Sequence, residues 1–198
     1  MARTARRSAA TDPSRTEPDP HTVPDATGLE LIAHDLREHA PGSVTATEHH
    51  RGAATLVIDP DAVLAVLRWL RETPNQDYHF LSSLHGCDYL PREPRFGVHY
   101  ELLNMERVER LHVKALIADP GDGELPEIDS VTGLFPTANF QEREIYDMFG
   151  VRFRGHPDLR RILMPDEYEG FPQRRDFPIG GEPVLFTHNE PDTPRWYE

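Results

Sequence analysis

Four side chains of types that commonly bind metals lie close together in the sequence: His79, His85, Cys87 and Asp88. Imidazole, thiolate and carboxylate are the ligands that zinc prefers, so the group is a candidate metal site. In an extended strand, however, His79 and His85 would be roughly 20 Å apart, which is too far for one ion. We therefore interpret these residues as ordinary half-buried side chains and expect no bound metal.

Two pairs of residues have the types needed for acid-base chemistry. Glu142 and Glu144 are two positions apart, a spacing that puts them on different sides of a helix, so they cannot form a carboxylate dyad. His156 and Asp158 would serve as a base and its orienting partner if the chain were a free-standing enzyme. The sequence has no glycine-rich phosphate loop. We expect neither catalytic residues nor a bound cofactor in this chain.

Composition excludes several classes of protein. The chain has 34 acidic and 21 basic residues and a net charge of −13, which disfavours binding to nucleic acid or anionic membranes. Its single cysteine, Cys87, excludes an internal disulfide and cannot supply the thiolates of an iron-sulfur cluster. The longest uncharged apolar runs, such as 53–58 and 62–67, are far shorter than the roughly 20 residues of a membrane-spanning helix. We expect a cytoplasmic chain without a span or a secretion signal.

The first part of the chain predicts two helices around a β-hairpin. Residues 1–27 have almost nothing to bury and are expected to form a disordered extension. Apolar residues then follow a helical spacing over 28–39. Two β-prone runs within 44–58 flank a polar turn, which indicates a hairpin. Asp59 followed by proline is typical of a helix start, and this second helix should end near Glu72.

The next part predicts a sheet and a third helix. Residues 78–89, 96–103 and 108–118 are rich in aromatic and branched side chains and indicate consecutive strands. In the last of these, apolar residues alternate with mostly polar ones, so one face can pack against a core. A short extended segment is expected at 130–135 and a helix at 136–149.

The chain should change character after this helix. Gly150 is expected to end the helix with a left-handed backbone, that is, with a positive φ. Residues 155–198 contain seven prolines, which forbid long helices, so an extended arm lying on a partner is expected. The fold class is α+β: a two-layer domain with helices packed on a mixed sheet, followed by a long extended C-terminal arm. The core domain should cover 28–154, between the extension 1–27 and the docking arm 155–198.

Charged and aromatic residues alternate densely between Phe140 and Phe177. This segment has eight acidic residues and seven arginines, whereas the whole chain is strongly acidic, so nearly all its charges can pair with one another or with a partner. Arginine and aromatic side chains are enriched at the centres of protein interfaces. Arg143 and Asp147 are four residues apart and are expected to pair on the helix surface. The segment therefore indicates a docking surface.

The order of residues in this segment carries a resemblance. It includes Glu142-Arg143-Glu144, Tyr146-Asp147-Met148-Phe149-Gly150 and Gly155-His156-Pro157-Asp158-Leu159-Arg160-Arg161-Ile162-Leu163, followed by Pro165-Asp166, Arg174-Arg175-Asp176-Phe177-Pro178 and Gly181-Glu182-Pro183. This signature resembles the family of the C subunit of bacterial NADH-quinone oxidoreductase, that is, of respiratory complex I (the complex I 30 kDa family). Residues 28–138 resemble that family only in outline. Many relatives have Trp at Phe140, His at Phe171 and Lys at Arg175.

The resemblance implies a non-catalytic structural subunit in the hydrophilic, peripheral arm of the proton-translocating complex, on the cytoplasmic side of the cell membrane. NADH, FMN, iron-sulfur clusters and quinone would belong to the whole complex, with none bound by this chain. The implied partners are other proteins of the hydrophilic arm, chiefly the D subunit and also the B subunit. The signature residues expected to dock partners are Glu142, Arg143, Glu144, Tyr146, Asp147, Phe149, Gly150, Gly155, His156, Pro157, Asp158, Arg160, Arg161, Arg174, Arg175, Asp176, Phe177 and Pro178.

Three alternatives remain. The same signature is compatible with a homologous subunit of a membrane-bound hydrogenase or a related oxidoreductase, which would have another electron donor. A free-standing enzyme using His156 and Asp158 belongs to a different class. A third is a generic acidic interaction module, which fits the composition but leaves the order of the dense segment without an explanation.

Overall fold

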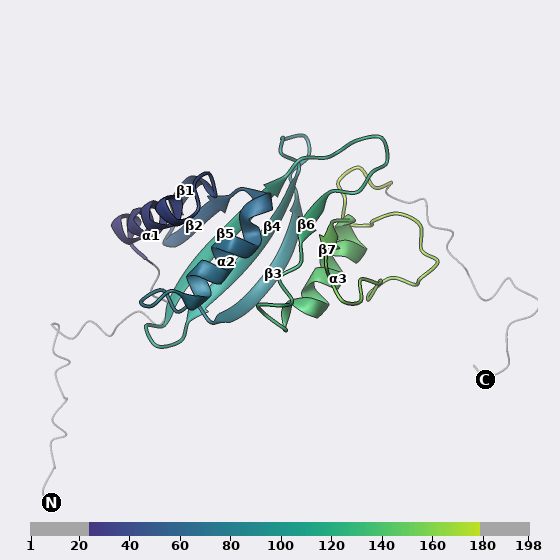
Figure 1. Ribbon diagram of the computed structural model, residues 1–198. Coiled ribbons are helices and arrows are strands. Elements are labelled where there is room, and N and C mark those ends of the chain that lie inside the picture. The colour runs from purple at the N-terminus through teal and green to yellow at the C-terminus, as the bar shows by residue number, and fades with distance from the viewer. Residues whose placement is uncertain (1–23, 179–198) are drawn as a thin grey trace, which may run out of the picture.

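A five-stranded mixed sheet forms the centre of the protein (Figure 1). The structure is a computed structural model of the chain, and it describes residues 24–178. The strand order is β1-β2-β5-β4-β3, in which β2 and β5 are parallel and the other neighbours are antiparallel. The strands are β1 (Val44–His50), β2 (Ala53–Ile58), β3 (Phe80–Asp88), β4 (Phe96–Asn104) and β5 (Glu109–Ile117). The predicted hairpin and the three predicted consecutive strands are confirmed.

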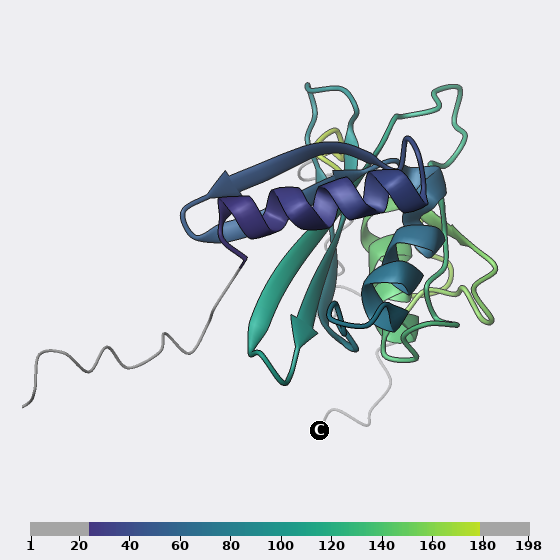
Figure 2. The ribbon, with the colours of Figure 1, turned by 60° about the vertical axis from the view of Figure 1, so that its left-hand side comes forward.

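Within residues 24–178, three helices pack on this sheet: α1 (Ala26–His39), α2 (Val63–Glu72) and α3 (Ala138–Phe149). Figures 1 and 2 show α1 beside the β1–β2 hairpin and α3 beside β3, with α2 between them along the sheet. Their apolar sides join alternate residues of the strands in one hydrophobic core. The expected α+β fold, with helices packed on a mixed sheet, is confirmed.

Local sequence signals explain where the first two helices begin. Asp25 precedes α1, and its carboxylate accepts a hydrogen bond from the backbone N–H of Gly28. Asp59 accepts from the N–H of Asp61 and starts a short 3-10 turn, η1 (Pro60–Ala62), which leads directly into α2. Such caps satisfy donors that the first turn of a helix leaves without a partner. Helix α2 ends at Glu72, as predicted.

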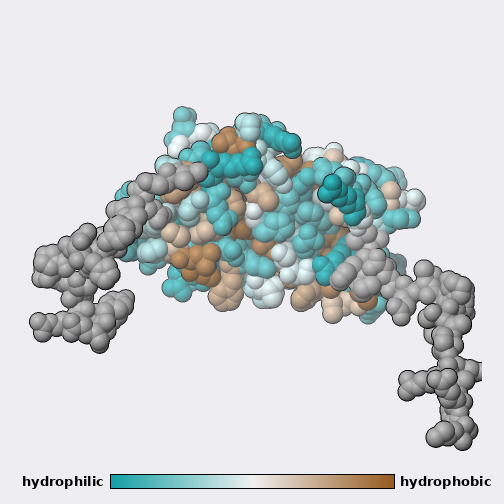
Figure 3. All heavy atoms as spheres, turned by 180° about the vertical axis from the view of Figure 1, so that it is seen from behind, coloured by the Kyte–Doolittle hydropathy of each residue, from teal (hydrophilic) through white to brown (hydrophobic). Residues whose placement is uncertain are grey.

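Strand β5 shows how the sheet divides into two faces. Leu111, Val113, Ala115 and Ile117 are buried in the core, as their alternation predicts. The residues between them point to the opposite face, which the three helices leave uncovered. Figure 3 views the molecule from behind, and its surface there is largely hydrophilic with scattered hydrophobic residues. Within 24–178, no helix combines the length and apolar character needed to cross a membrane.

Gly150 ends α3 as the sequence predicts. Its φ is 72°, in the left-handed region, and its N–H donates to the carbonyl of Tyr146 at 2.9 Å. A Cβ built on this residue would lie 2.5 Å from a ring carbon of Phe171. The chain therefore needs glycine here both for the backbone conformation and for the close approach of an aromatic ring.

One predicted element is wrong. Residues 130–135 form turns instead of an extended segment, and the strand lies just before them, as β6 (Glu127–Asp129). This strand pairs in parallel with β7 (Arg152–Arg154), a short element that the sequence pattern does not predict. The side chain of Glu142 explains why residues 130–135 turn. The N–H of Val131 donates a hydrogen bond to its carboxylate, and the backbone therefore turns toward α3.

The predicted extension 1–27 lies outside the described residues except for 24–27, and α1 already begins at Ala26. Of the predicted arm 155–198, residues 179–198 lie outside the described residues. Residues 155–178 contain no helix and no strand. The boundary between core and arm stays a prediction.

Replacing Gly150 by alanine should destabilise the fold by about 2 to 4 kcal/mol, because a left-handed backbone is combined with a steric clash. Urea unfolding followed by circular dichroism measures this loss. Gly121→Ala is the matched control: its φ is 75°, but nothing lies within 4 Å of the added Cβ. Equal losses in the two variants would show that contact with Phe171 is unimportant.

Candidate docking site on the third helix and the arm

Asp147 is the buried anchor of the signature segment. Its side chain is fully buried near the end of α3. One carboxylate oxygen, Oδ2, accepts hydrogen bonds from three consecutive N–H groups, those of Ile162, Leu163 and Met164, at 3.0, 2.7 and 2.8 Å. Burial alone would raise the pKa of Asp147, but these N–H groups and Arg161 stabilise the anion, and the net result is a lowered pKa. The carboxylate thus fixes the arm against its own helix.

Arg161 completes this arrangement from the arm. It donates to Oδ1 of Asp147 at 2.6 Å and to the carbonyls of Tyr168 and Gly170 at 2.8 and 2.9 Å. Its guanidinium also lies over the ring of Phe171, 5.5 Å from the centroid. The planar, five-donor geometry of arginine suits this combination of partners. Most of its bonding capacity is therefore used inside the chain.

The expected surface pair between Arg143 and Asp147 is wrong. Arg143 donates instead to the carbonyls of Arg160 and Arg161, at 3.2 and 3.0 Å. Asp147 points into the protein, where the three N–H groups and Arg161 outcompete a single exposed partner. Both residues fasten the arm to α3.

Glu142 is a second buried acid on the same helix. It accepts from the hydroxyl of Ser130 and from the N–H of Val131, each at 2.7 Å. Burial raises the pKa of this carboxyl to about 7, although the two hydrogen bonds oppose the shift. Glu144, by contrast, is exposed, which agrees with the prediction that the two acids do not form a dyad.

His156 does not form a catalytic pair with Asp158. Its Nδ1 accepts from the backbone N–H of Asp158 at 3.0 Å, and its Nε2 lies 3.2 Å from the carbonyl of Asn139. The Asp158 carboxylate binds Arg160 at 3.0 Å instead. The imidazole is fully buried, with Nε2 4.0 Å from the carboxylate of Glu142. This geometry is that of a side chain holding the arm to α3, and the Asp158 carboxylate does not orient the imidazole.

A second anchor, the Arg95 cluster, consists of Arg95, Asp88, Asp119 and Asp176. The buried guanidinium of Arg95 binds both oxygens of Asp88, at 3.1 and 2.9 Å, and binds Asp119 and Asp176 at 2.7 Å each. Burial by itself would raise the pKa of Asp88, but the bonds from Arg95 and from backbone N–H groups lower it to about 2. The cluster joins β3, the residue before β4, the loop after β5 and the arm.

The neighbouring arginines of the arm also contact the domain. Arg174 lies over the rings of Phe96 and Phe171, 4.9 and 4.8 Å from their centroids, and donates to the carbonyl of Phe149 at 2.6 Å. Arg175 donates to the carbonyl of Leu90 at 2.6 Å. Residues 155–178 thus already lie on the chain's own domain, through Arg161, Arg174 and Arg175. The expectation that the arm lies on a partner stays a prediction.

The signature residues separate into buried and exposed groups. Glu142, Asp147 and Gly150 are buried and support the fold. Two hydrophobic side chains of the segment from Phe140 to Phe177 are strongly exposed: Phe140 at 64% and Leu163 at 61%. Exposure here is averaged over backbone and side chain. The exposed signature residues are Glu144, Gly155, Pro157, Asp158, Arg160, Arg175, Asp176 and Pro178. The half-buried ones are Arg143, Tyr146, Phe149, His156, Arg161, Arg174 and Phe177. Docking by these residues stays a prediction.

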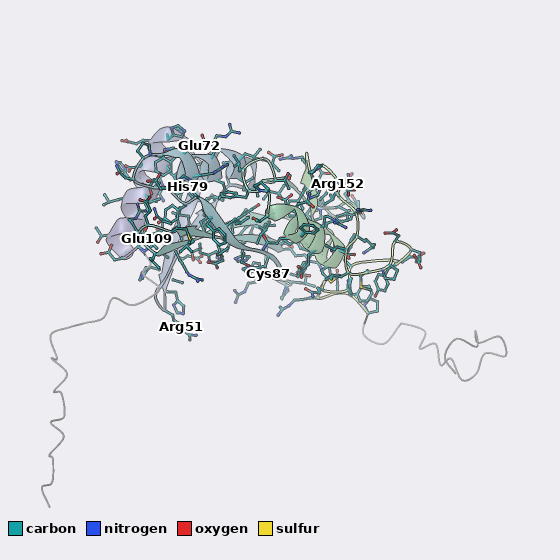
Figure 4. All side chains as sticks on the ribbon, turned by 90° about the horizontal axis from the view of Figure 1, so that it is seen from below. Arg51, Glu72, His79, Cys87, Glu109 and Arg152 are labelled. Atoms are coloured by element: carbon teal, nitrogen blue, oxygen red, sulfur yellow. The ribbon has the colours of Figure 1, made fainter. Side chains whose placement is uncertain are left out.

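The metal-type residues singled out in the sequence do not come together. His79 lies before β3 and pairs with Asp77, Asp88 belongs to the Arg95 cluster, and Figure 4 shows His79 and Cys87 at separate places along the sheet. His85 instead lies beside His99 and His112 of the next two strands, with one ring nitrogen of each within 4.8 Å of the others. The strands predicted at 78–89, 96–103 and 108–118 contain the three histidines, but only the register of these strands decides which histidines face each other.

Asp147→Asn should cost about 2 to 4 kcal/mol in the free energy of unfolding, since an amide cannot replace a buried anion facing three N–H groups and an arginine. The folded pKa of Asp147 is lowered, so this deficit should shrink as pH falls below about 4. Urea unfolding at pH 7 and pH 3.5 measures both effects. Glu144→Gln, an exposed acid on the same helix, is the control and should change stability by under about 0.5 kcal/mol.

Glu142→Gln should change how stability depends on pH. The folded pKa is raised from 4.5 to about 7, so the folded protein keeps a proton that the unfolded chain releases, and stability falls as pH rises through this interval. Glutamine cannot titrate. Relative to the parent chain, the variant should gain up to about 3 kcal/mol between pH 4.5 and pH 8. If the urea midpoints of the two proteins changed with pH in the same way across this range, the raised pKa of Glu142 would be contradicted.

Comparisons with known proteins agree with the signature. A family described as respiratory-chain NADH dehydrogenase, 30 Kd subunit, matches residues 56–183. The chain is similar to the C subunit of NADH-quinone oxidoreductase from Roseiflexus sp. strain RS-1, with 43% identity over 155 residues, covering 78% of this chain and 87% of the relative. The C subunit of the same enzyme from Herpetosiphon aurantiacus is 48% identical over 141 residues, covering 70% of this chain and 79% of that protein.

A solved structure is also similar in fold. It is a chain in the structure of the membrane-bound sulfane sulfur reductase, an archaeal respiratory membrane complex, with a TM-score of 0.60 and 25% sequence identity. The match covers 76% of this chain and 85% of that chain. The family match includes most of the sheet, α3 and the entire signature segment, so the resemblance read from the sequence is confirmed. This chain belongs to the family of the respiratory-chain NADH dehydrogenase 30 Kd subunit.

Proposed function

We propose that the chain is a structural subunit, without catalysis of its own, in the peripheral arm of a proton-translocating NADH-quinone oxidoreductase. Its docking neighbours are then the D subunit together with the B subunit, on the cytoplasmic side of the cell membrane. NADH, FMN, iron-sulfur clusters and quinone belong to the assembled complex. Family membership is the starting point, and the distribution of charges in the signature segment supports the structural role.

The observation that carries the proposal is that ion pairs fasten the segment to the chain's own domain. Asp147 with Arg161, and Asp176 with Arg95, hold residues 155–178 there. Carboxylates and guanidiniums that are paired in this way are unsuited to moving protons or electrons. They also hold the surface of the arm and α3 in one conformation. A rigid, preformed surface lowers the ordering cost of association, which is what a docking subunit requires.

The exposed part of this surface has the composition of an interface. Phe140 and Leu163 are large, exposed and apolar, and Arg160 is exposed near Leu163 in sequence. Arg143 lies over the ring of Phe140, 5.9 Å from its centroid, which places a positive charge next to an apolar group. Aromatic and arginine side chains of this kind are typical anchors of protein interfaces.

A related assembly is the second candidate. The solved chain of similar fold comes from a membrane-bound sulfane sulfur reductase, so this architecture also occurs in a respiratory complex that reduces a different substrate. A subunit of a hydrogenase-type or sulfur-reducing complex would use the same exposed surface. The partners recovered with the protein separate the two candidates.

Leu163→Ser should reduce recovery of partner subunits several-fold when the full chain is purified by affinity from gently solubilised membranes and its partners are identified by mass spectrometry. The expected partners are the other hydrophilic-arm subunits. Leu31→Ser on α1 is the matched control, because Leu31 is 60% exposed and lies away from the signature segment. It should leave recovery unchanged.

The same purification decides between the candidates. Recovery of hydrogenase or sulfur-reductase subunits would favour the second. A parent chain that elutes alone, as a folded monomer, would exclude an assembly role. Equal recovery for Leu163→Ser and Leu31→Ser would show that the proposed surface is not the docking surface.

A further inference from the structure

Three histidines face one another on the side of the sheet that the helices leave uncovered. His85 on β3 lies directly opposite His99 on β4, and His112 on β5 lies opposite Glu101, two residues farther along β4. One ring nitrogen from each imidazole lies within 4.8 Å of the other two. Three adjacent strands of one sheet are a rigid support for such a set.

The distances between the rings are close to those of a metal site. Nδ1 of His99 and Nε2 of His112 lie 2.9 Å apart, and the ring of His85 stacks on that of His99, with centroids 4.9 Å apart. Nitrogen ligands at about 2.0 Å from a tetrahedral zinc ion are about 3.3 Å from each other. If the nitrogens of His99 and His112 moved apart by a few tenths of an ångström, an ion would therefore fit between them.

The outer nitrogens of the two inner rings are already held. Tyr89 Oη lies 2.7 Å from Nε2 of His99, and Thr55 Oγ1 lies 3.2 Å from Nδ1 of His112. When each hydroxyl oxygen accepts the ring N–H, both remaining nitrogens present lone pairs to the space between the rings. Metal-binding histidines are commonly oriented by such second hydrogen bonds.

The charges around the group favour neutral imidazoles. Burial and the neighbouring His112, His85 and Lys114 lower the pKa of His99 to about 3, and burial lowers the pKa of His112 as well. Lys114 lies on the same face and would repel a cation, but its ammonium binds the carboxylate of Glu48 at 2.8 Å.

One carboxylate lies next to the imidazoles. Oε1 of Glu101 is 3.7 Å from Nε2 of His112, on the same face of β4 as His99. An anionic oxygen at this place offsets part of the charge of a divalent cation. It is also a ligand type that zinc accepts together with imidazole.

We propose that His85, His99 and His112 form a binding site for one divalent transition-metal ion of the zinc type, with the carboxylate of Glu101 close to His112. Three imidazoles with water in the fourth position are a donor set that zinc accepts, and cobalt and nickel also bind imidazole. His85 is exposed, so an ion reaches the site from solvent, while His99 is buried and fixes its inner side. The inference goes beyond the proposed function and does not depend on which complex contains the chain.

The test uses the full chain without a histidine tag, stripped of metal by a chelating resin and titrated with zinc chloride by calorimetry. We expect one zinc ion per chain. Cobalt chloride should give the visible absorption bands of tetrahedral Co²⁺. His85→Ala, at an exposed position that leaves the fold intact, should weaken zinc binding at least tenfold. Tyr89→Phe removes the hydrogen bond to His99 and should weaken it about tenfold.

Two controls keep the result interpretable. His79→Ala removes an exposed histidine outside the group, and a variant with both His49 and His50 changed to alanine removes the neighbouring pair at the end of β1. Neither should alter the affinity. Absence of zinc binding, or binding that is lost with His49 and His50 and kept in His85→Ala, would overturn the proposal.

Discussion

The structure around the signature segment depends on one buried carboxylate, that of Asp147. A charge without solvent is costly unless it is fully paired, and three N–H groups and one guanidinium pair it here. Because the three N–H groups are consecutive, the backbone from Ile162 to Met164 must curve around the carboxylate. That curvature determines the path of the arm along α3, and the Arg95 cluster holds the arm again at Asp176.

The two faces of the sheet differ in the kind of contacts they make. On the helix side, apolar residues of every strand and helix form one core, which accounts for the stability of the domain. On the other side, polar groups form short networks among the strands, as with Lys114 and Glu48 or Tyr89 and His99. Gly97 makes room for the Tyr89 ring, because a Cβ there would lie 2.6 Å from it. The polar contacts on this face therefore lie apart from the apolar core.

Periodicity predicted most of the elements, because helices and strands that bury one side must repeat their apolar residues at 3.6 or 2 positions. Gly150 was predictable for a similar reason, since few other residues tolerate its φ. The anchors were not predictable. Asp147 looks like an exposed partner for Arg143 until the arm brings three N–H groups to it, and Asp88 meets Arg95 only through a turn. The histidine group depends on strand register, so closeness in sequence did not indicate it: of the residues considered at 79–88, only His85 belongs to it.

The parallel contact between β2 and β5 also has a consequence for how the chain is made. Thr55 and His112 are neighbours across this contact although 57 positions separate them. During synthesis, α1, the first hairpin and α2 leave the ribosome before the strand that completes their sheet. Until residue 117 has emerged, the inner edge of β2 has no partner, and its unpaired amide groups are open to pairing with other chains. The nascent protein therefore passes through an aggregation-sensitive interval whose length is set by the rate of translation, and that interval ends when β5 closes the sheet.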